Sequence, residues 1–510
     1  MSDRTIEQQL ARLDAGEPVD AAAVMALPTL DKEAALRAWP CPVHLGREGV
    51  EARRHSYIAY RKRLARLRRH VRRVAEEERQ ARVKRGAFHR VRSDPDLWLQ
   101  MLDSPSQPAV LEPRAMPVDV PRVVEDFKPI MCRLKERRGR PAASQEVFTR
   151  GALYSDGRVD MCKQVPGPAW IEQFVRSVAD DAGASVRHFL MGNSVVGRRG
   201  ADAIAAYVRR DRPAIETWYL AGNELDAGCA EQLCGALKDD PHARALWLKR
   251  NPLGADGARH VADMLRGSNQ IRVLDLSNTA LGDEGLRHVA EALRDNSSLR
   301  VLYLDANGIT PAGAVHLYRL LAGGRCSLTH LYVCMNPLGD DGARLVAQGL
   351  EVYDRLEVLA MSSCRMGPAG LYNLCEALWP SESLRVLNVG HYKATADMGE
   401  LPNSFGAYGA HTLCRFVQHN RRVEVLDFSV THVPDAAVRG VAQEVLARRA
   451  RGEPTVRLLV AHQYGFPTGA ATGGLLTNVR SLGRMSVQEK RVLCHTEDVV
   501  NIDSMYRNSM

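Results

Sequence analysis

The chain has 510 residues, of which 45% are hydrophobic and 25% charged, a composition that excludes an intrinsically disordered protein. No stretch approaches the roughly 20 apolar residues of a membrane-spanning helix, and the first residues lack the apolar core of a secretory signal peptide. The eleven cysteines are odd in number and form no CxxC pair, so we expect reduced thiols, a cytoplasmic protein, and neither a metal site nor a cofactor.

Residues 1–103 are expected to form a helical, basic N-terminal region. The positive charge is concentrated in residues 51–92, where 16 Lys and Arg stand against 4 Glu, while the whole chain has a net charge of +9. Within 51–85, apolar residues follow one another at spacings of three and four, which predicts a single apolar seam on a cationic helix. The seam comprises Tyr57, Tyr60, Leu64, Leu67, Val71 and Val74.

Three interpretations of this basic helix stay open at the level of sequence. Its seam could dock on the rest of the N-terminal region and leave the cations in solvent. The segment 51–92 could instead contact nucleic acid or an anionic membrane surface. The helix 51–85 could also bind an acidic partner, a second copy, or the chain's own repeats.

Residues 104–121 are rich in proline and are expected to form an extended linker. Residues 122–184 follow as an N-terminal cap. Their sequence alternates around Asp156–Gly157, a dipeptide typical of a β-hairpin turn. A hairpin here would cover the exposed edge of the first repeat, which a stacked array of repeats requires.

From 185 to 470 the pattern L-x-x-L-x-L-x-x-N recurs about ten times. Six of the nine intervals between the final positions are 28 or 29 residues long, which indicates a true repeat. Each strand pattern is followed by a turn with paired glycines, such as Gly282 and Gly285, and then by an amphipathic helix. The final positions are Asn193, Asn223, Asn251, Thr279, Asn307, Asn336, Cys364, Tyr392, Thr431 and Gln463.

A 28-residue period with Asn or Cys at the turn resembles the ribonuclease-inhibitor type of leucine-rich repeat, which also occurs in Ran GTPase-activating protein and in NOD-like receptors. The resemblance covers roughly 185–470. It implies an α/β solenoid shaped as a horseshoe, with a parallel sheet inside and helices outside, preceded here by a mainly helical region. Residues 471–510 would form a C-terminal cap or tail. The scaffold implies no single function.

The interval from Tyr392 to Thr431 is 39 residues, so about eleven residues are inserted after the eighth strand. The inserted segment resembles one in bacterial leucine-rich-repeat proteins, from which no activity can be named. Loops at strand ends often carry function, and residues 391–405 offer acid, base and hydrogen-bonding groups. These candidates are His391, Lys393, Asp397, Glu400 and Asn403.

Within each repeat, the residue between the last two apolar strand positions is expected to face the concave side of the sheet. Five of the first six such residues are aromatic, and charged residues flank them. Rigid aromatic side chains beside fixed charges are typical of a protein-binding hot spot. The predicted face comprises Phe189, Tyr219, Trp247, Lys249, Asp275, Tyr303, Asp305 and Tyr332, followed by Ala360, Asn388, Asp427 and Leu459.

The sequence thus favours a non-catalytic scaffold whose concave face binds a protein or peptide. The basic N-terminal helix covering this face from within the same chain is an alternative. An enzyme or enzyme activator acting through 391–405 is a second alternative, and a nucleic-acid or anionic-surface binder acting through 51–92 is a third. No nucleotide-binding GxxxxGK[ST] loop, HExxH or GxSxG motif is present, so we expect no catalytic residues.

Overall fold

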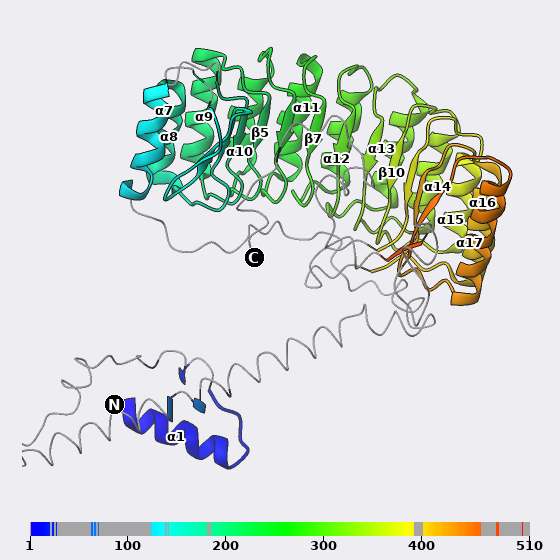
Figure 1. Ribbon diagram of the computed structural model, residues 1–510, viewed down its shortest axis with the longest axis horizontal. Helices are drawn as coiled ribbons and strands as arrows, with labels where there is room; N and C mark the ends of the chain where they lie inside the picture. The colour runs from blue at the N-terminus through cyan, green and yellow to red at the C-terminus, as the bar shows by residue number, and fades with distance from the viewer. Residues whose placement is uncertain are drawn as a thin grey trace, which may run out of the picture. The chain divides into compact units, whose positions relative to one another are not determined.

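The computed structural model describes residues 2–20, 23–24, 27, 63–64, 66–67, 70, 124–137, 140, 142–180, 185–391, 401–460, 476–478 and 502. The chain divides into two compact units, Met1–Arg90 and Val91–Met510. The larger unit alternates short strands with helices from one end to the other (Figure 1).

Each strand of the larger unit is only two to four residues long, and a helix follows most of them. The part before the repeats contains η2 (Val124–Asp126), α7 (Lys128–Arg137), β1 (Glu146–Val147), β2 (Ala152–Leu153), β3 (Arg158–Asp160) and α8 (Gly167–Asp180). The first repeats contain β4 (His188–Leu190), α9 (Gly197–Asp211), β5 (Thr217–Tyr219), α10 (Ala227–Leu237), β6 (Ala245–Trp247), α11 (Gly254–Gly267), β7 (Val273–Asp275), α12 (Gly282–Leu293), β8 (Val301–Tyr303) and α13 (Pro311–Ala322). The later ones contain β9 (His330–Tyr332), α14 (Gly339–Leu350), β10 (Val358–Ala360), α15 (Pro368–Leu378), β11 (Val386–Asn388), α16 (Gly406–His419), β12 (Val425–Asp427), α17 (Asp435–Ala450), β13 (Arg457–Val460) and β14 (Leu476–Asn478).

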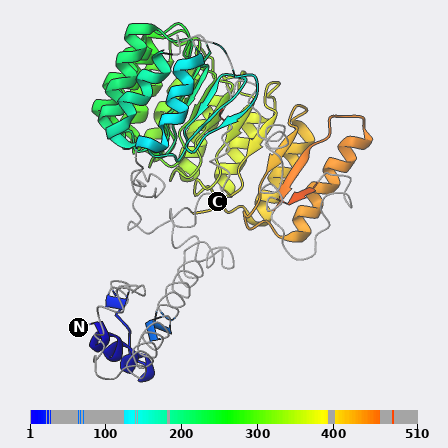
Figure 2. The ribbon, with the colours of Figure 1, turned by 60° about the vertical axis from the view of Figure 1, so that its left-hand side comes forward.

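The described strands form one open sheet in sequence order, β1 to β14. From β3 to β14 every neighbouring pair is parallel, and the helices form a single layer on one face of the sheet (Figures 1 and 2). Consecutive parallel strands are joined by helices that all lie on the same side of the sheet, and the first described strand does not pair with the last. The fold is therefore an open α/β solenoid, as the sequence predicts. The sheet continues beyond residue 470, because β14 pairs in parallel with β13.

The hydrophobic core lies between the sheet and the layer of helices. The middle residue of each strand points into it, as Leu246, Leu274 and Leu302 do, all fully buried against apolar helix residues. Side chains alternate across a strand, so the first and third residues of each strand lie on the face opposite the helices. We call this opposite face the inner face; it is the face that the sequence predicts to be concave.

An antiparallel hairpin begins the sheet. Strands β2 and β3 pair across the turn at Asp156–Gly157, where Gly157 has a φ of +83°, and β3 then pairs in parallel with β4. The turn is therefore the one that the sequence predicts, and β3 occupies the edge of the first repeat. A side chain at 157 would also collide with the backbone of Ser185, so glycine is needed for space as well as for conformation.

Paired glycines start several helices for two different reasons. Gly282 has a φ of +60°, a left-handed conformation that glycine adopts without strain. Gly285 has no such need, but a Cβ there would lie 2.9 Å from the Cβ of Leu281 and 3.2 Å from that of Ala258 in the preceding helix. The second glycine therefore allows consecutive helices to approach closely.

Buried asparagines join consecutive repeats. The Oδ1 of Asn307 accepts hydrogen bonds from the backbone N–H groups of Thr279 (3.0 Å) and Leu281 (3.3 Å) one repeat earlier. Its Nδ2 donates to the carbonyls of Leu276 (2.8 Å) and Leu304 (3.0 Å). Asn251 and Asn336 make the same set of contacts with their own preceding turns. These side chains satisfy backbone groups that the bend after each strand leaves unpaired.

The asparagine of the eighth repeat is Asn403, and the prediction of Tyr392 at this position is wrong. Asn403 accepts from the N–H groups of Cys364 and Met366, both at 2.9 Å, and donates to the carbonyls of Met361 (2.9 Å) and Val389 (2.8 Å). Each of these four sequence separations is eleven residues longer than its counterpart at Asn307. The insertion therefore lies between the strand and its asparagine, whereas a fixed 28-residue period places it after the turn.

The smaller unit contains α1 (Ser2–Asp14) and described helical residues of the basic segment. Leu64 and Leu67, two members of the predicted seam, are buried in one cluster with Ile6 of α1. Ion pairs flank the cluster, Arg63 with Glu7 at 3.3 Å and Arg66 with Asp14 at 2.6 Å. At these residues the structure supports the interpretation in which the seam docks within the N-terminal region. The other four predicted seam residues lie outside the described part of the chain.

We predict that Asn307→Ala lowers the free energy of unfolding by about 3 kcal/mol or more, because several buried backbone groups lose their partner at once. Urea denaturation followed by circular dichroism measures this loss. Asn269→Ala, at an exposed position, is the matched control and should leave stability within about 0.5 kcal/mol. Equal stability of the two variants would contradict the role given to the buried asparagines.

Candidate functional site: the inner face of the sheet

The strand register fixes which residues share a row on the inner face. The pairing of Tyr219 with Trp247, Trp247 with Asp275, Asp275 with Tyr303, and Tyr303 with Tyr332 places these five side chains side by side. The row continues through Ala360, Asn388, Asp427 and Leu459. The structure therefore brings the predicted residues from β5 onward together on one surface.

Phe189 does not belong to this row, and its predicted place is wrong. It pairs with Trp218 and is buried in the core, 5.4 Å from the Trp218 ring and 6.3 Å from the Phe174 ring between centroids. Leu190 takes the place in the row, because it pairs with Tyr219. The sequence places the turn residue of this degenerate first repeat at Asn193. In the structure the backbone N–H of Ser194 donates to the Oδ1 of Asn223, as the N–H of Asn223 donates to Asn251, so the register is shifted by one residue.

The aromatic residues of the row form a continuous cluster. The centroids of Tyr219 and Trp247 are 6.0 Å apart, those of Trp247 and Tyr303 5.5 Å, and those of Tyr303 and Tyr332 4.3 Å with nearly parallel rings. Trp247 and Tyr303 stand two strands apart, about 10 Å by ordinary sheet spacing, so their rings lean toward each other across Asp275. We call Tyr219, Trp247, Tyr303 and Tyr332 the aromatic cluster.

Space for the cluster at its N-terminal end is provided by a glycine. A Cβ at Gly192 would collide with the ring of Tyr219, so the absence of a side chain there lets this ring lie against the backbone of the preceding turn. Such rigid placement suits recognition, because little conformational entropy remains to be lost when a partner binds.

A second row of the inner face, formed by the first residue of each strand, was missed by the sequence reasoning. Its apolar members run beside the aromatic and polar row and are buried. The two-residue alternation that places Trp247 on the inner face also places Ala245 there, so the signal was present in the sequence. The row includes Ala245, Val273, Val301, Val358, Val386 and Val425.

Charged residues lie next to the aromatic cluster. Lys249 Nζ lies 3.9 Å from Asp275 Oδ2, and the Oδ1 of Asp275 accepts the N–H of Ser277 at 2.9 Å. The Oδ1 of Asp305 accepts the N–H of Cys334 at 2.7 Å. Burial, with a smaller contribution from the charge of Asp275, raises the pKa of Asp305 to about 7, even though the Cys334 hydrogen bond and Lys249 lower it. The inner face therefore contains a carboxyl group that titrates near neutral pH.

The indole N–H of Trp247 is a buried donor. Trp247 is 4% exposed, and its Nε1 has no hydrogen-bond partner in the part of the chain that the structure describes. A buried unpaired donor costs free energy, and an acceptor brought by a bound segment would recover it.

The aromatic cluster is in contact with a residue from the far C-terminal part of the chain. Ile502 packs against the buried apolar group of the inner face that includes Tyr219 and Trp247, and these two residues are only 3% and 4% exposed. Tyr303 and Tyr332 are half-buried. A long exposed aromatic strip is rare on a soluble protein, and here an aliphatic side chain of the same chain lies on it.

The inserted-loop candidates divide into two groups. Lys393, Asp397 and Glu400 lie outside the described residues. His391 Nδ1 lies 3.3 Å from Ser363 Oγ, a part-buried hydrogen bond. Asn403 is buried, and its side chain makes the backbone hydrogen bonds of the eighth repeat. The prediction that Asn403 is a loop residue available for chemistry is therefore wrong. Among the described residues, no group of three or more His, Cys, Asp or Glu side chains could hold a metal ion.

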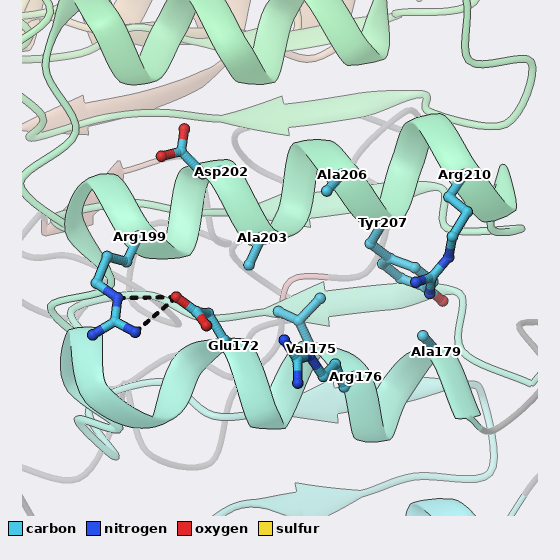
Figure 3. Close-up of a pocket in the computed structure, with 10 residues that line it drawn as sticks. All are labelled: Glu172, Val175, Arg176, Ala179, Arg199, Asp202, Ala203, Ala206, Tyr207 and Arg210. Atoms are coloured by element: carbon cyan, nitrogen blue, oxygen red, sulfur yellow. Dashed lines mark hydrogen bonds and ion pairs between the residues drawn. The ribbon is translucent and has the colours of Figure 1, made fainter.

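A hollow on the helical face lies between α8 and α9 (Figure 3). Its volume is about 360 Å³, and an ion pair between Arg199 and Glu172 closes one end. Small side chains such as Ala203 and Ala206 leave this space open between the two helices. The hollow is a gap left between two packed helices, and none of its lining residues belongs to the inner face.

The family comparison agrees with the repeat geometry. A family model described as Leucine Rich repeat matches residues 268–290, which include β7 and most of α12. The chain contains leucine-rich repeats. Among its described residues, no helix combines the length and apolar character needed to cross a bilayer.

The curated relatives share a short part of this leucine-rich-repeat protein. The NACHT, LRR and PYD domains-containing protein 3 of mouse, rhesus macaque and human is in each case 38% identical over 76 residues, 15% of this chain. The match spans 7% of the length of these relatives. A solved structure, the Rad7 and Elc1 complex in yeast, is similar over 61% of this chain and 78% of that chain, with 13% identity and a TM-score of 0.39.

The first prediction from this site concerns pH. The folded-state pKa of Asp305 is raised above its unfolded value, so the folded protein binds this proton more tightly. The contribution of Asp305 to stability should therefore fall as pH rises from about 4 to about 7, by at most about 1.4 kcal/mol per pH unit, and stay constant above that range. The difference in unfolding free energy between wild type and Asp305→Asn, measured by urea denaturation at several pH values, reports it.

Asp295→Asn, which removes an exposed carboxylate, is the control for loss of charge. A pH-independent difference between wild type and Asp305→Asn across this range would show that Asp305 does not titrate there.

The second prediction separates the two roles considered for the inserted segment. Asn403→Ala should lower the free energy of unfolding about as much as Asn307→Ala, because both lose the same set of buried contacts. His391→Ala, which removes a half-exposed side chain and its part-buried hydrogen bond with Ser363, should lower it by about 1 kcal/mol or less. Thermal and urea denaturation measure both, and an Asn403→Ala variant as stable as wild type would refute the structural role.

Proposed function

We propose that this protein is a non-catalytic scaffold that binds an extended segment of a protein partner on its inner face, at the aromatic cluster. The observation that carries the proposal is the continuous set of neighbouring aromatic rings from Tyr219 to Tyr332, within an apolar surface against which an aliphatic side chain already packs. Aromatic side chains supply large contact area at low entropic cost, and they dominate binding energy at protein interfaces.

The chemistry of the face indicates the kind of segment it would take. The cluster offers apolar contact for an aliphatic or aromatic side chain, and the Trp247 Nε1 offers a donor for a backbone carbonyl. Lys249, Asp275 and Asp305, which lie close enough to influence one another electrostatically, would pair with polar groups flanking that anchor. The ribonuclease-inhibitor type of repeat and a cytoplasmic location are part of the same proposal, and the 28-residue period supports the first of them.

Several described polar groups that could serve catalysis already hold the backbone in place. Asn403 and the carboxylates Asp275 and Asp427 hold backbone N–H groups, so each already has a structural role. Binding therefore remains the function for which the described geometry is best suited.

A peptide selection tests the proposal. Phage-displayed random peptides selected on the full-length protein should include sequences with a bulky apolar anchor, and the double variant Trp247→Ala, Tyr303→Ala should weaken their binding at least a hundredfold. Two hot-spot aromatics contribute roughly 2 kcal/mol or more each, which corresponds to that loss. Fluorescence anisotropy with labelled peptides measures the affinities.

The matched control is Tyr372→Ala, Tyr408→Ala, which removes two exposed aromatic side chains from the helical face. This variant should bind the peptides like wild type. If the inner-face variant also binds like wild type while remaining folded by circular dichroism, or if no peptide is selected, the proposed function is refuted.

A further inference from the structure

Ile502 is the one residue described between β14 and the end of the chain, and it packs against the buried apolar group of the inner face to which Tyr219 and Trp247 belong. In sequence it follows Asn478, the last residue of β14, by about 24 residues, a length that can span up to about 80 Å. The distance from β14 to β9 along the sheet is five strand spacings, roughly 24 Å. The chain is therefore long enough for Ile502 to reach the cluster from the opposite end of its own sheet.

The contact joins an aliphatic side chain to an apolar surface. The cluster and the neighbouring Ala245, Val273 and Val301 form one apolar surface, and Ile502 adds an aliphatic side chain to it. Burying one aliphatic side chain is a modest gain in free energy, so a partner segment with a larger apolar surface can displace it. Tyr303 and Tyr332 stay half-buried beside it, which leaves apolar surface accessible at the C-terminal half of the cluster.

We infer that the C-terminal segment carrying Ile502 is an internal ligand of the inner face, which a partner segment must displace in order to bind. The inference rests on the proposed function for its biological meaning, but the contact itself rests on Ile502 and the aromatic cluster. The sequence had suggested that the basic N-terminal helix could cover this face; the occupant assigned here comes from the other end of the chain.

Displacement has a measurable consequence. If the internal segment occupies the face for 90–99% of the time, the affinity for a competing segment is reduced tenfold to a hundredfold. Weakening the internal contact removes this reduction and raises the affinity for any ligand of the same surface.

The test uses the full-length protein and a synthetic peptide that comprises residues 495–510, labelled for fluorescence anisotropy. The Ile502→Asp chain should bind the wild-type peptide at least tenfold more tightly than the wild-type chain does, because a charged side chain no longer competes for the apolar surface. The same peptide with Ile502→Asp should not bind either chain. Adding Trp247→Ala to the Ile502→Asp chain should abolish the binding of the wild-type peptide.

Val352→Asp is the matched control, because it places the same charge at an exposed apolar residue on the helical side of the repeats; it should behave like wild type. Circular dichroism and the milder Ile502→Ala variant show whether a change in affinity follows from loss of fold. Equal affinity of the wild-type and Ile502→Asp chains for the peptide, or absence of binding to both, would overturn the inference.

Sedimentation velocity separates internal from intermolecular occupation. The wild-type chain should stay a monomer at the concentrations used, and a dimer that Ile502→Asp dissociates would mean that the segment belongs to a second copy and would overturn the internal form. The selected peptides separate this inference from the proposed function. If they bind through Trp247 and Tyr303 with the same affinity in wild type and Ile502→Asp, the internal ligand is refuted and the binding function stands.

Discussion

Every other feature of the repeat region depends on the buried bend after each strand. A chain that turns sharply inside a hydrophobic core leaves backbone N–H and C=O groups without partners, and each such group costs free energy unless it is paired. In five of the described repeats an asparagine side chain (Asn223, Asn251, Asn307, Asn336 or Asn403) pairs several of them, and it does so with the turn of the preceding repeat. Because the contact joins neighbours, it fixes the strand register from one repeat to the next. The order of residues on the inner face follows from that register.

The eighth repeat illustrates how strongly this contact is maintained. Eleven extra residues separate β11 from its asparagine, yet Asn403 makes the same four backbone hydrogen bonds as Asn307. The insertion thus leaves the register of β11 and β12 intact, and Asp427 stays in the row with Asn388. Additional chain is accommodated at the strand end, where it disturbs neither the core nor the sheet.

A rigid register has a consequence for recognition. Aromatic rings from four different repeats meet at fixed distances, and Trp247 contacts Tyr303 across an intervening strand. The same surface includes a buried carboxyl group, Asp305, whose pKa is raised to about 7 by burial. Apolar anchoring and a charge that changes near neutral pH therefore occur on one face. The presence of Ile502 on this face suggests that the protein supplies its own ligand until a partner replaces it.

The sequence by itself determined the solenoid, because the 28-residue period, the strand–helix alternation and the turn asparagines are local patterns. It also determined the row from Tyr219 to Tyr332, since alternation along a strand decides which side chains share a face. It failed where the pattern is degenerate or interrupted, at Phe189 in the first repeat and at Tyr392 beside the insertion, because a one-residue shift or an inserted loop can be located only by the partner strand. Only the tertiary structure decided that Asn403 is a structural residue and that Ile502 reaches the aromatic cluster. These contacts join residues far apart in the chain, and no short-range pattern encodes them.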